Sequence, residues 1–154
     1  MKTHLDRIDL KILRLLQGNG RISNLDLSRR IHLSPAPCLA RVRRLEQAGY
    51  ISRYRAQLNP ELLGLSLLAF IEITLDRTTP DVFEKFKQAV QEVPEIEECH
   101  MVAGGFDYLV KVRSADMEAY RKILGEKVVT IPGVLQTHTY VVMEQVKQTG
   151  ELNI

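Results

Sequence analysis

The chain has 154 residues, of which 45% are hydrophobic and 26% charged, with 9 Gly, 6 Pro and 2 Cys. These proportions fit one folded domain or two small ones, and they exclude a disordered chain, a collagen-like fibre and a disulfide-stapled secreted miniprotein. The longest apolar stretch, residues 62–73, is broken by Gly64, Ser66 and Glu72, so it does not fit a transmembrane helix. The first turns are charged, unlike a signal peptide, and the two isolated cysteines favour a reducing compartment. We therefore expect a cytoplasmic protein without a membrane partner.

Charge is distributed unevenly along the chain, although the net charge is only +2. Residues 1–55 carry twelve Lys/Arg against four Asp/Glu, a net charge of +8, whereas the remaining 99 residues have a net charge of −6. A basic half joined to an acidic half is typical of a polyanion-binding module attached to a separate partner domain. On charge alone, a basic face that is merely solvated explains the pattern equally well.

Two short helices are predicted at the start of the basic half. The first begins after Asp6, continues through apolar residues at helical spacing and ends at residues 18–20, where glycines favour a left-handed helix end. The second begins at Ser23, which is spaced from Asp26 as in a capping box, and closes at His32.

A third helix follows after a tight turn. Ser34 is a good N-cap and Pro35 suits the first helical position, so we expect a helix from there to about residue 48, stopping at Gly49. Residues 50–56 alternate in character, which predicts a short strand or wing. Two helices joined by a tight turn are typical of a helix-turn-helix module.

The outward face of the third helix predicts contact with DNA. Cys38 and Leu45 fall on one face, whereas Arg41 and Arg44 fall on the opposite face with Arg43 beside them. The N-terminal end of such a helix normally enters the major groove, where arginine reads guanine. A three-helix bundle with a solvated basic face is the alternative. The candidate DNA-binding residues are Ser34, Ala36, Pro37, Arg41, Arg43 and Arg44.

The acidic half alternates between strand and helix patterns. The predicted strands cover residues 67–75, 96–103, 107–113 and 136–146, and helices begin near residues 80 and 116. This order is β-α-β-β-α-β, the split ferredoxin-like arrangement. We therefore expect an α+β protein with a winged helix-turn-helix domain over residues 1–55, a linker over 56–64 and a ferredoxin-like domain over 65–154. The first and last strands are apolar on both faces, which favours a homodimer or a larger assembly.

The chain resembles the feast/famine, or Lrp/AsnC, family of transcriptional regulators. Motifs in the same order cover nearly the whole sequence, and they lie at residues 5–9, 20–24, 33–38, 41–46, 49–51, 98–100, 104–108, 117–122 and 139–144. The resemblance implies a sequence-specific DNA-binding regulator of amino-acid metabolism. It also implies a C-terminal domain that dimerises, assembles into octamers or larger rings, and binds an amino acid between dimers.

The same resemblance places an effector site at the turn between the second and third strands. Two glycines there allow backbone N–H groups to approach a carboxylate, and Asp107 can accept hydrogen bonds from an α-ammonium group. The apolar character of the remaining positions suits leucine or methionine. The residues that the resemblance implies are Met101, Val102, Gly104, Gly105, Asp107, Tyr108, Tyr140 and Val141. Many relatives have an acidic residue at the position of Gly105, so effector preference is expected to differ here.

Other chemistry is poorly supported by the sequence. Glu97 to His100 include three types of metal ligand, but neighbouring strand residues point to opposite faces and do not converge. We find no phosphate-binding glycine loop and no catalytic triad or acid–base pair, so we expect neither an enzyme, a metal site nor a resident cofactor. Two other hypotheses remain open: an amino-acid-sensing module without its own DNA target, and a ferredoxin-like enzyme that consumes an amino acid.

Overall fold

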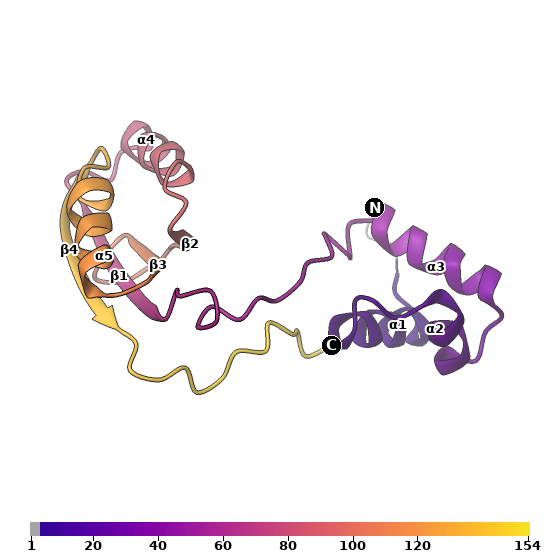
Figure 1. The fold of residues 1–154 in the computed structure, drawn as a ribbon. Helices are drawn as coiled ribbons and strands as arrows, with labels where there is room; N and C mark the ends of the chain where they lie inside the picture. The colour runs from indigo at the N-terminus through magenta and orange to yellow at the C-terminus, as the bar shows by residue number, and fades with distance from the viewer. Residues whose placement is uncertain (1–3) are drawn as a thin grey trace. The chain divides into compact units, whose positions relative to one another are not determined.

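The computed structural model describes residues 4–154 and divides them into two units (Figure 1). The first unit contains the residues up to Gln57 together with Lys147–Ile154, and the second contains Leu58–Val146. The tail therefore packs with the first unit, whereas the sequence led us to expect it in the second domain. In the tail, the main-chain N–H of Leu152 donates to Oε1 of Gln17 at 2.7 Å, and the Gln17 amide donates to the Leu152 carbonyl at 3.1 Å.

Three helices form the first unit, as predicted: α1 (Arg7–Gly18), α2 (Asn24–Ile31) and α3 (Pro35–Gln47). Asp6 caps α1 in a complete capping box with Asp9, and the Ser23 hydroxyl accepts from the main-chain N–H of Asp26. Helix α1 ends within residues 18–20 as predicted, but its C-cap is Asn19 and neither neighbouring glycine is left-handed. Ile12, Leu27, Ile31, Cys38 and Leu45 form the buried core of this unit.

The segment after α3 forms no strand. Gly49 adopts a left-handed conformation, with φ at +78°, and ends the helix as predicted. Residues 50–66 form turns and irregular backbone without strand pairing, so of the two alternatives expected for residues 50–56, a short strand or a wing, the strand is absent from the structure. Its alternating pattern lacks a neighbouring strand with which to pair. Among residues 4–154, no helix has the length and apolar character needed to cross a membrane.

The second unit is a four-stranded antiparallel sheet with helices on one face (Figure 1). The strands lie in the order β2-β3-β1-β4, and the β-α-β-β-α-β order of elements along the chain is the ferredoxin-like arrangement predicted from the sequence. The elements are β1 (Leu67–Leu75), α4 (Pro80–Gln91), β2 (Ile96–Met101), β3 (Tyr108–Ser114), α5 (Met117–Lys122), the π-helix η1 (Ile123–Val128) and β4 (Val134–Val141). Strands β2 and β4 end earlier than expected, and a single backbone hydrogen bond continues each pairing, from Val102 to the Asp107 carbonyl and from Val142 to the Leu68 carbonyl.

The core of this unit lies between the sheet and its helices. Alternate residues of β1, such as Ile71 and Ile73, are fully buried against α4, α5 and η1. Burial of apolar side chains such as these is the dominant favourable contribution to folding. The opposite face of the sheet carries a cross-strand row in which Glu98 pairs with Lys111, Lys111 with Phe70, and Phe70 with Tyr140.

Candidate DNA-binding and effector sites

The N-terminal half of α3 presents small side chains to solvent. Ser34, Ala36 and Pro37 are exposed, whereas Cys38 is fully buried in the core below them. The Ser34 hydroxyl makes no capping hydrogen bond, although Ser34 occupies the N-cap position as predicted. Small exposed residues allow the backbone of this helix end to approach another surface closely, as phosphate contacts at helix N-termini require.

Two of the three candidate arginines on α3 are engaged within the protein. Nη1 of Arg41 lies 2.8 Å from Oδ1 of Asp9 and 2.7 Å from Oδ2 of Asp6. Nη2 of Arg44 lies 2.6 Å from Oδ2 of Asp9. The Asp9 side chain is only 1% exposed. Sequence periodicity placed both arginines on the outward face, but their guanidinium groups turn towards α1 because the buried carboxylate needs counter-charges.

The α1 capping box and this ion-pair cluster share the same two carboxylates. The main-chain N–H of Asp9 donates to Asp6 at 2.8 Å, and the main-chain N–H of Asp6 donates back to Asp9 at 3.2 Å. The hydrogen bond from the Asp9 backbone, and then the one from Arg41, lower the pKa of Asp6 below its usual value. In turn, the side chains of Asp6 and Asp9 raise the pKa of Arg41. The N-terminus of α1 is thereby joined to the middle of α3.

Arg43 is the remaining arginine of the predicted set, and its side chain faces solvent. It is exposed and makes no hydrogen bond or ion pair with any residue in the described range 4–154. At helical spacing it shares a face with Ala36 and Ala40, opposite the buried Leu45. The outward guanidinium of α3 is therefore that of Arg43, which sequence periodicity had placed at the side of the exposed face.

The turn between β2 and β3 exposes both candidate glycines. A Cβ atom built on Gly104 or Gly105 would meet nothing within 4 Å, and neither residue has a positive φ. Asp107 is tied to the end of β1, because its Oδ2 accepts from the main-chain N–H of Leu75 at 2.7 Å. Its main-chain N–H also donates to the Ile73 carbonyl at 2.9 Å. One carboxylate oxygen of Asp107 thus secures the turn.

Tyr108 lies in the core and not on the surface of the turn. Its ring is 2% exposed and stacks on Phe86 of α4, with ring centroids 4.3 Å apart. Its hydroxyl is buried without a hydrogen-bond partner among residues 4–154, and burial raises its pKa. The neighbouring Met101 is 55% exposed at the end of β2, and Val102 is half-buried. The structure therefore separates a structural Tyr108 from an accessible Met101.

The last two effector candidates lie at the opposite edge of the sheet. Tyr140 and Val141 belong to the edge strand β4 and are 55% and 44% exposed. Three strand spacings and about three residues of rise separate Tyr140 from Met101, which corresponds to roughly 17 Å. The negative charge of Glu72 raises the pKa of the Tyr140 hydroxyl. One copy of the chain thus does not bring all eight candidate residues together.

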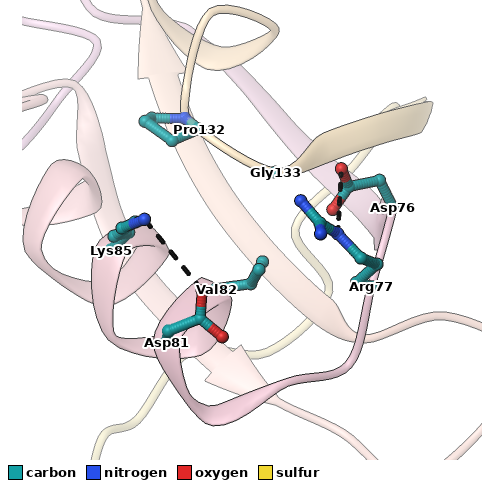
Figure 2. Close-up of a pocket in the computed structure, with 7 residues that line it drawn as sticks. All are labelled: Asp76, Arg77, Asp81, Val82, Lys85, Pro132 and Gly133. Carbon is teal, nitrogen blue, oxygen red and sulfur yellow. Dashed lines mark ion pairs between the residues drawn. The ribbon is translucent and has the colours of Figure 1, made fainter.

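A surface pocket of the second unit contains none of the candidate effector residues. Figure 2 shows its lining side chains, which come from the segment that follows β1, the start of α4 and the segment before β4. They form the two ion pairs Asp76–Arg77 (3.8 Å) and Asp81–Lys85 (4.0 Å).

Within the described part of the chain, no group of three His, Cys, Asp or Glu residues could hold a metal ion. Glu98 and His100 share one face of β2 and lie 3.2 Å apart, whereas Cys99 faces the core.

The two units match two family models. Residues 5–52 match the winged helix-turn-helix DNA-binding model, and residues 68–152 match the Lrp/AsnC ligand binding domain. The chain belongs to the Lrp/AsnC family. Its Lrp/AsnC relatives include the leucine-responsive regulatory proteins of Klebsiella pneumoniae and Escherichia coli K12, each 61% identical over 97% of this chain and 92% of the relative. The protein is therefore a DNA-binding transcriptional regulator of this family.

Solved structures agree with this assignment. A transcriptional regulator from Neisseria meningitidis, determined as a complex with L-methionine, superposes with a TM-score of 0.92 at 38% identity, over 97% of this chain and 96% of that one. AsnC from Escherichia coli superposes with a TM-score of 0.87 at 26% identity, over 95% of this chain and 97% of that one. Because the family consists of transcriptional regulators and residues 5–52 of this chain match a DNA-binding model, this Lrp/AsnC protein is not an enzyme, nor a sensing module without DNA binding.

Proposed function

We propose that this Lrp/AsnC regulator binds specific DNA sequences through α3 and controls amino-acid metabolism in response to a bound amino acid. The observation that carries the DNA part is the exposed N-terminal half of α3, with small residues at its start, and the exposed Arg43 about two turns further along the helix, which has no partner among residues 4–154. A recognition helix needs close access at its first turn and a donor that reaches base edges. The site of action is then the cytoplasm, where bacterial DNA lies.

The effector that fits this protein best is leucine or methionine. The regulator from Neisseria meningitidis was crystallised with L-methionine, and the curated relatives are named for their response to leucine. In this chain, exposed backbone at Gly104 and Gly105 is accessible to a carboxylate, and the exposed Met101 offers apolar contact beside it. The free oxygen of Asp107 is available to an α-ammonium group.

The effector site is proposed to form between copies of the chain. Met101 and the turn lie at one edge of the sheet, whereas Tyr140 and Val141 lie at the other, so the full residue set meets only when chains pack together. The uncovered sheet face also carries apolar groups, including Phe70 and Leu109. We therefore propose a homodimer that assembles into octamers or larger rings, with the amino acid acting through the assembly.

Calorimetric titration with the twenty common amino acids, followed by sedimentation of the protein with each one that binds, tests the effector proposal. We expect leucine or methionine to bind and to shift the assembly size. A Gly105→Glu variant should change affinity without changing folding, because a side chain at that position meets open space. Binding of no amino acid below millimolar concentration would contradict the proposal.

A further inference from the structure

We propose that Asp9 is a positioning residue for DNA recognition, which fixes α3 through Arg41 and Arg44 and leaves Arg43 to read base edges. This inference rests on the proposed role of α3 in sequence-specific binding. Asp9 belongs to α1 and has no exposed surface from which to touch DNA, since its side chain is 1% exposed. Its influence on DNA must therefore pass through the residues that it holds.

The Asp9 carboxylate holds α3 at two points. One oxygen accepts from Arg41 at 2.8 Å, and the other accepts from Arg44 at 2.6 Å. The two arginines lie one helical turn apart on α3, so a single contact would leave the helix free to rotate about its axis, whereas two contacts one turn apart also limit that rotation. Charge-assisted hydrogen bonds from arginine have strict planar geometry, which makes such a clamp selective for one orientation.

Helix capping alone does not account for the burial of Asp9. Asp26 occupies the same third position of α2, three residues after its own N-cap, yet its side chain is 56% exposed. Asp26 contacts Ser23 at 2.7 Å and Arg29 at 3.7 Å, and among residues 4–154 no hydrogen bond or ion pair joins its side chain to α3. A buried carboxylate is costly unless it is paired. The additional burial at Asp9 therefore reflects its contacts with the two α3 arginines.

The clamp assigns different roles to three arginines of one helix. The guanidinium groups of Arg41 and Arg44 donate hydrogen bonds to the carboxylates of Asp6 and Asp9. Arg43 has no partner within the described residues and faces solvent. A bidentate contact between arginine and guanine needs both nitrogens of the guanidinium fork to be free. Arg43 meets that requirement, and an accurately held helix lets it meet the same base pair in every complex.

The experiment starts by selecting a preferred duplex from a random library with the unmodified full-length protein. Affinities for that duplex and for a scrambled duplex are then measured at several salt concentrations for Asp9→Asn and for Asp26→Asn. The two variants remove the same charge from the same helix position, so they differ only in burial and in contact with α3. Circular dichroism identifies the variants that fold.

For Asp9→Asn we expect the ratio of the affinity for the preferred duplex to that for the scrambled duplex to fall by about tenfold or more. The reason is that a mobile α3 no longer holds Arg43 in position for a base contact, and one such contact accounts for a ratio of about this size. Non-specific affinity should be retained or raised, and the salt dependence should steepen by about one per guanidinium released onto phosphate. Asp26→Asn should keep its discrimination. Equal loss on both duplexes, or unchanged discrimination, would overturn the proposal. Failure of the unmodified protein to select any duplex would instead contradict the proposed function.

A second variant tests the same proposal if Asp9→Asn does not fold. Arg44→Lys retains the charge of a side chain that is 45% exposed but removes the planar fork. A repeated selection with this variant should give weaker preferences at every position of the half-site. The matched Arg43→Lys variant should relax preference at a single base pair. Relaxation of one base pair by Arg44→Lys would show that Arg44 reads DNA directly, and the proposal would be wrong.

Discussion

Buried polar atoms differ in how completely this protein satisfies them. Both oxygens of Asp9 are occupied by Arg41, Arg44 and a backbone N–H, whereas the Tyr108 hydroxyl has no partner among residues 4–154. A satisfied buried carboxylate resists substitution, because removal of one partner leaves the others unpaired. An unsatisfied hydroxyl has the opposite property, since its removal also removes a desolvation cost.

We expect Tyr108→Phe to raise the free energy of unfolding by about 1 kcal/mol, because the buried hydroxyl costs roughly 1–3 kcal/mol when it is unpaired. The ring contacts with Phe86 would be kept. Urea unfolding of both proteins at the same protein concentration measures the difference. A decrease in stability would mean that the hydroxyl has a partner, and amino-acid affinity measured on the same samples would report any role in binding.

Asp6 predicts a loss of stability in acid. Its pKa is lower in the folded protein than the unfolded value of 3.8, first through the Asp9 backbone and then through Arg41. The resulting stabilisation is present above the unfolded pKa and is lost as pH falls through the folded value. Asn is also a good N-cap, so Asp6→Asn should melt at a lower temperature than the unmodified protein at pH 6, and this difference should shrink as pH falls below 3.8. A temperature difference that persists at low pH would contradict this assignment.

At the scale of elements, two glycines in turns have opposite constraints. Gly133, just before β4, has φ at +89°, and a Cβ atom there would lie 2.7 Å from Cγ1 of Val82 in α4. Gly105, between β2 and β3, has neither restriction. The start of β4 is therefore fitted closely to α4, whereas the β2–β3 turn has room for a side chain at Gly105.

Gly133→Ala should lower the free energy of unfolding by about 1–3 kcal/mol, through backbone strain and the clash with Val82. Gly105→Ala serves as the matched control and should change it by less than about 0.5 kcal/mol. Thermal unfolding monitored by circular dichroism gives both values. Equal effects at the two positions would refute the assigned difference in constraint.

The elements were largely predictable because local signals agree with the tertiary packing. Caps and Pro35 located the helices, and β1 was predicted with its observed bounds because its apolar run ends in polar turns. Orientation was harder to predict. Arg41 and Arg44 satisfy an outward helical pattern, but only the tertiary structure shows that a buried Asp9 from another helix lies within reach.

Part of the candidate effector site was also unpredictable, because it depends on tertiary contacts that the sequence pattern does not show. Tyr108 follows a glycine-rich turn, where exposure is expected, yet the ring fits beneath α4 against Phe86. The separation of Tyr140 from Met101 depends on strand order, which pattern alone does not place in space. The prediction of a strand over residues 50–56 was wrong, because an alternating pattern indicates a strand but does not show whether a partner strand lies beside it.

At the scale of the molecule, the two parts of the sequence carry net charges of opposite sign. The first 55 residues have a net charge of +8 and the remainder −6. A basic helix-turn-helix domain attracts phosphate from a distance, whereas an acidic ligand-binding domain is repelled by it. The charge distribution thus favours approach to DNA by the domain that carries α3.

DNA affinity should therefore fall steeply with salt. If six or more phosphates are contacted, affinity is expected to drop by about 10³ or more between 50 and 200 mM salt. Fluorescence anisotropy with a labelled duplex measures this slope. An Arg43→Gln variant should weaken binding to the preferred duplex and leave the slope unchanged, because Arg43 is proposed to contact bases. A slope shallower by about one would show that Arg43 contacts phosphate and would contradict that role.

The return of the tail to the first unit makes that unit discontinuous in sequence. Residues up to Gln57 are completed by Lys147–Ile154, and Gln17 is bonded to Leu152 in both directions. The ligand-binding unit is consequently an insertion with two covalent tethers to the DNA-binding unit. A fragment that ends at Gln57 would lack the tail segment that Gln17 binds. A fragment of the DNA-binding unit should therefore include residues 147–154, joined to Gln57 by a short loop.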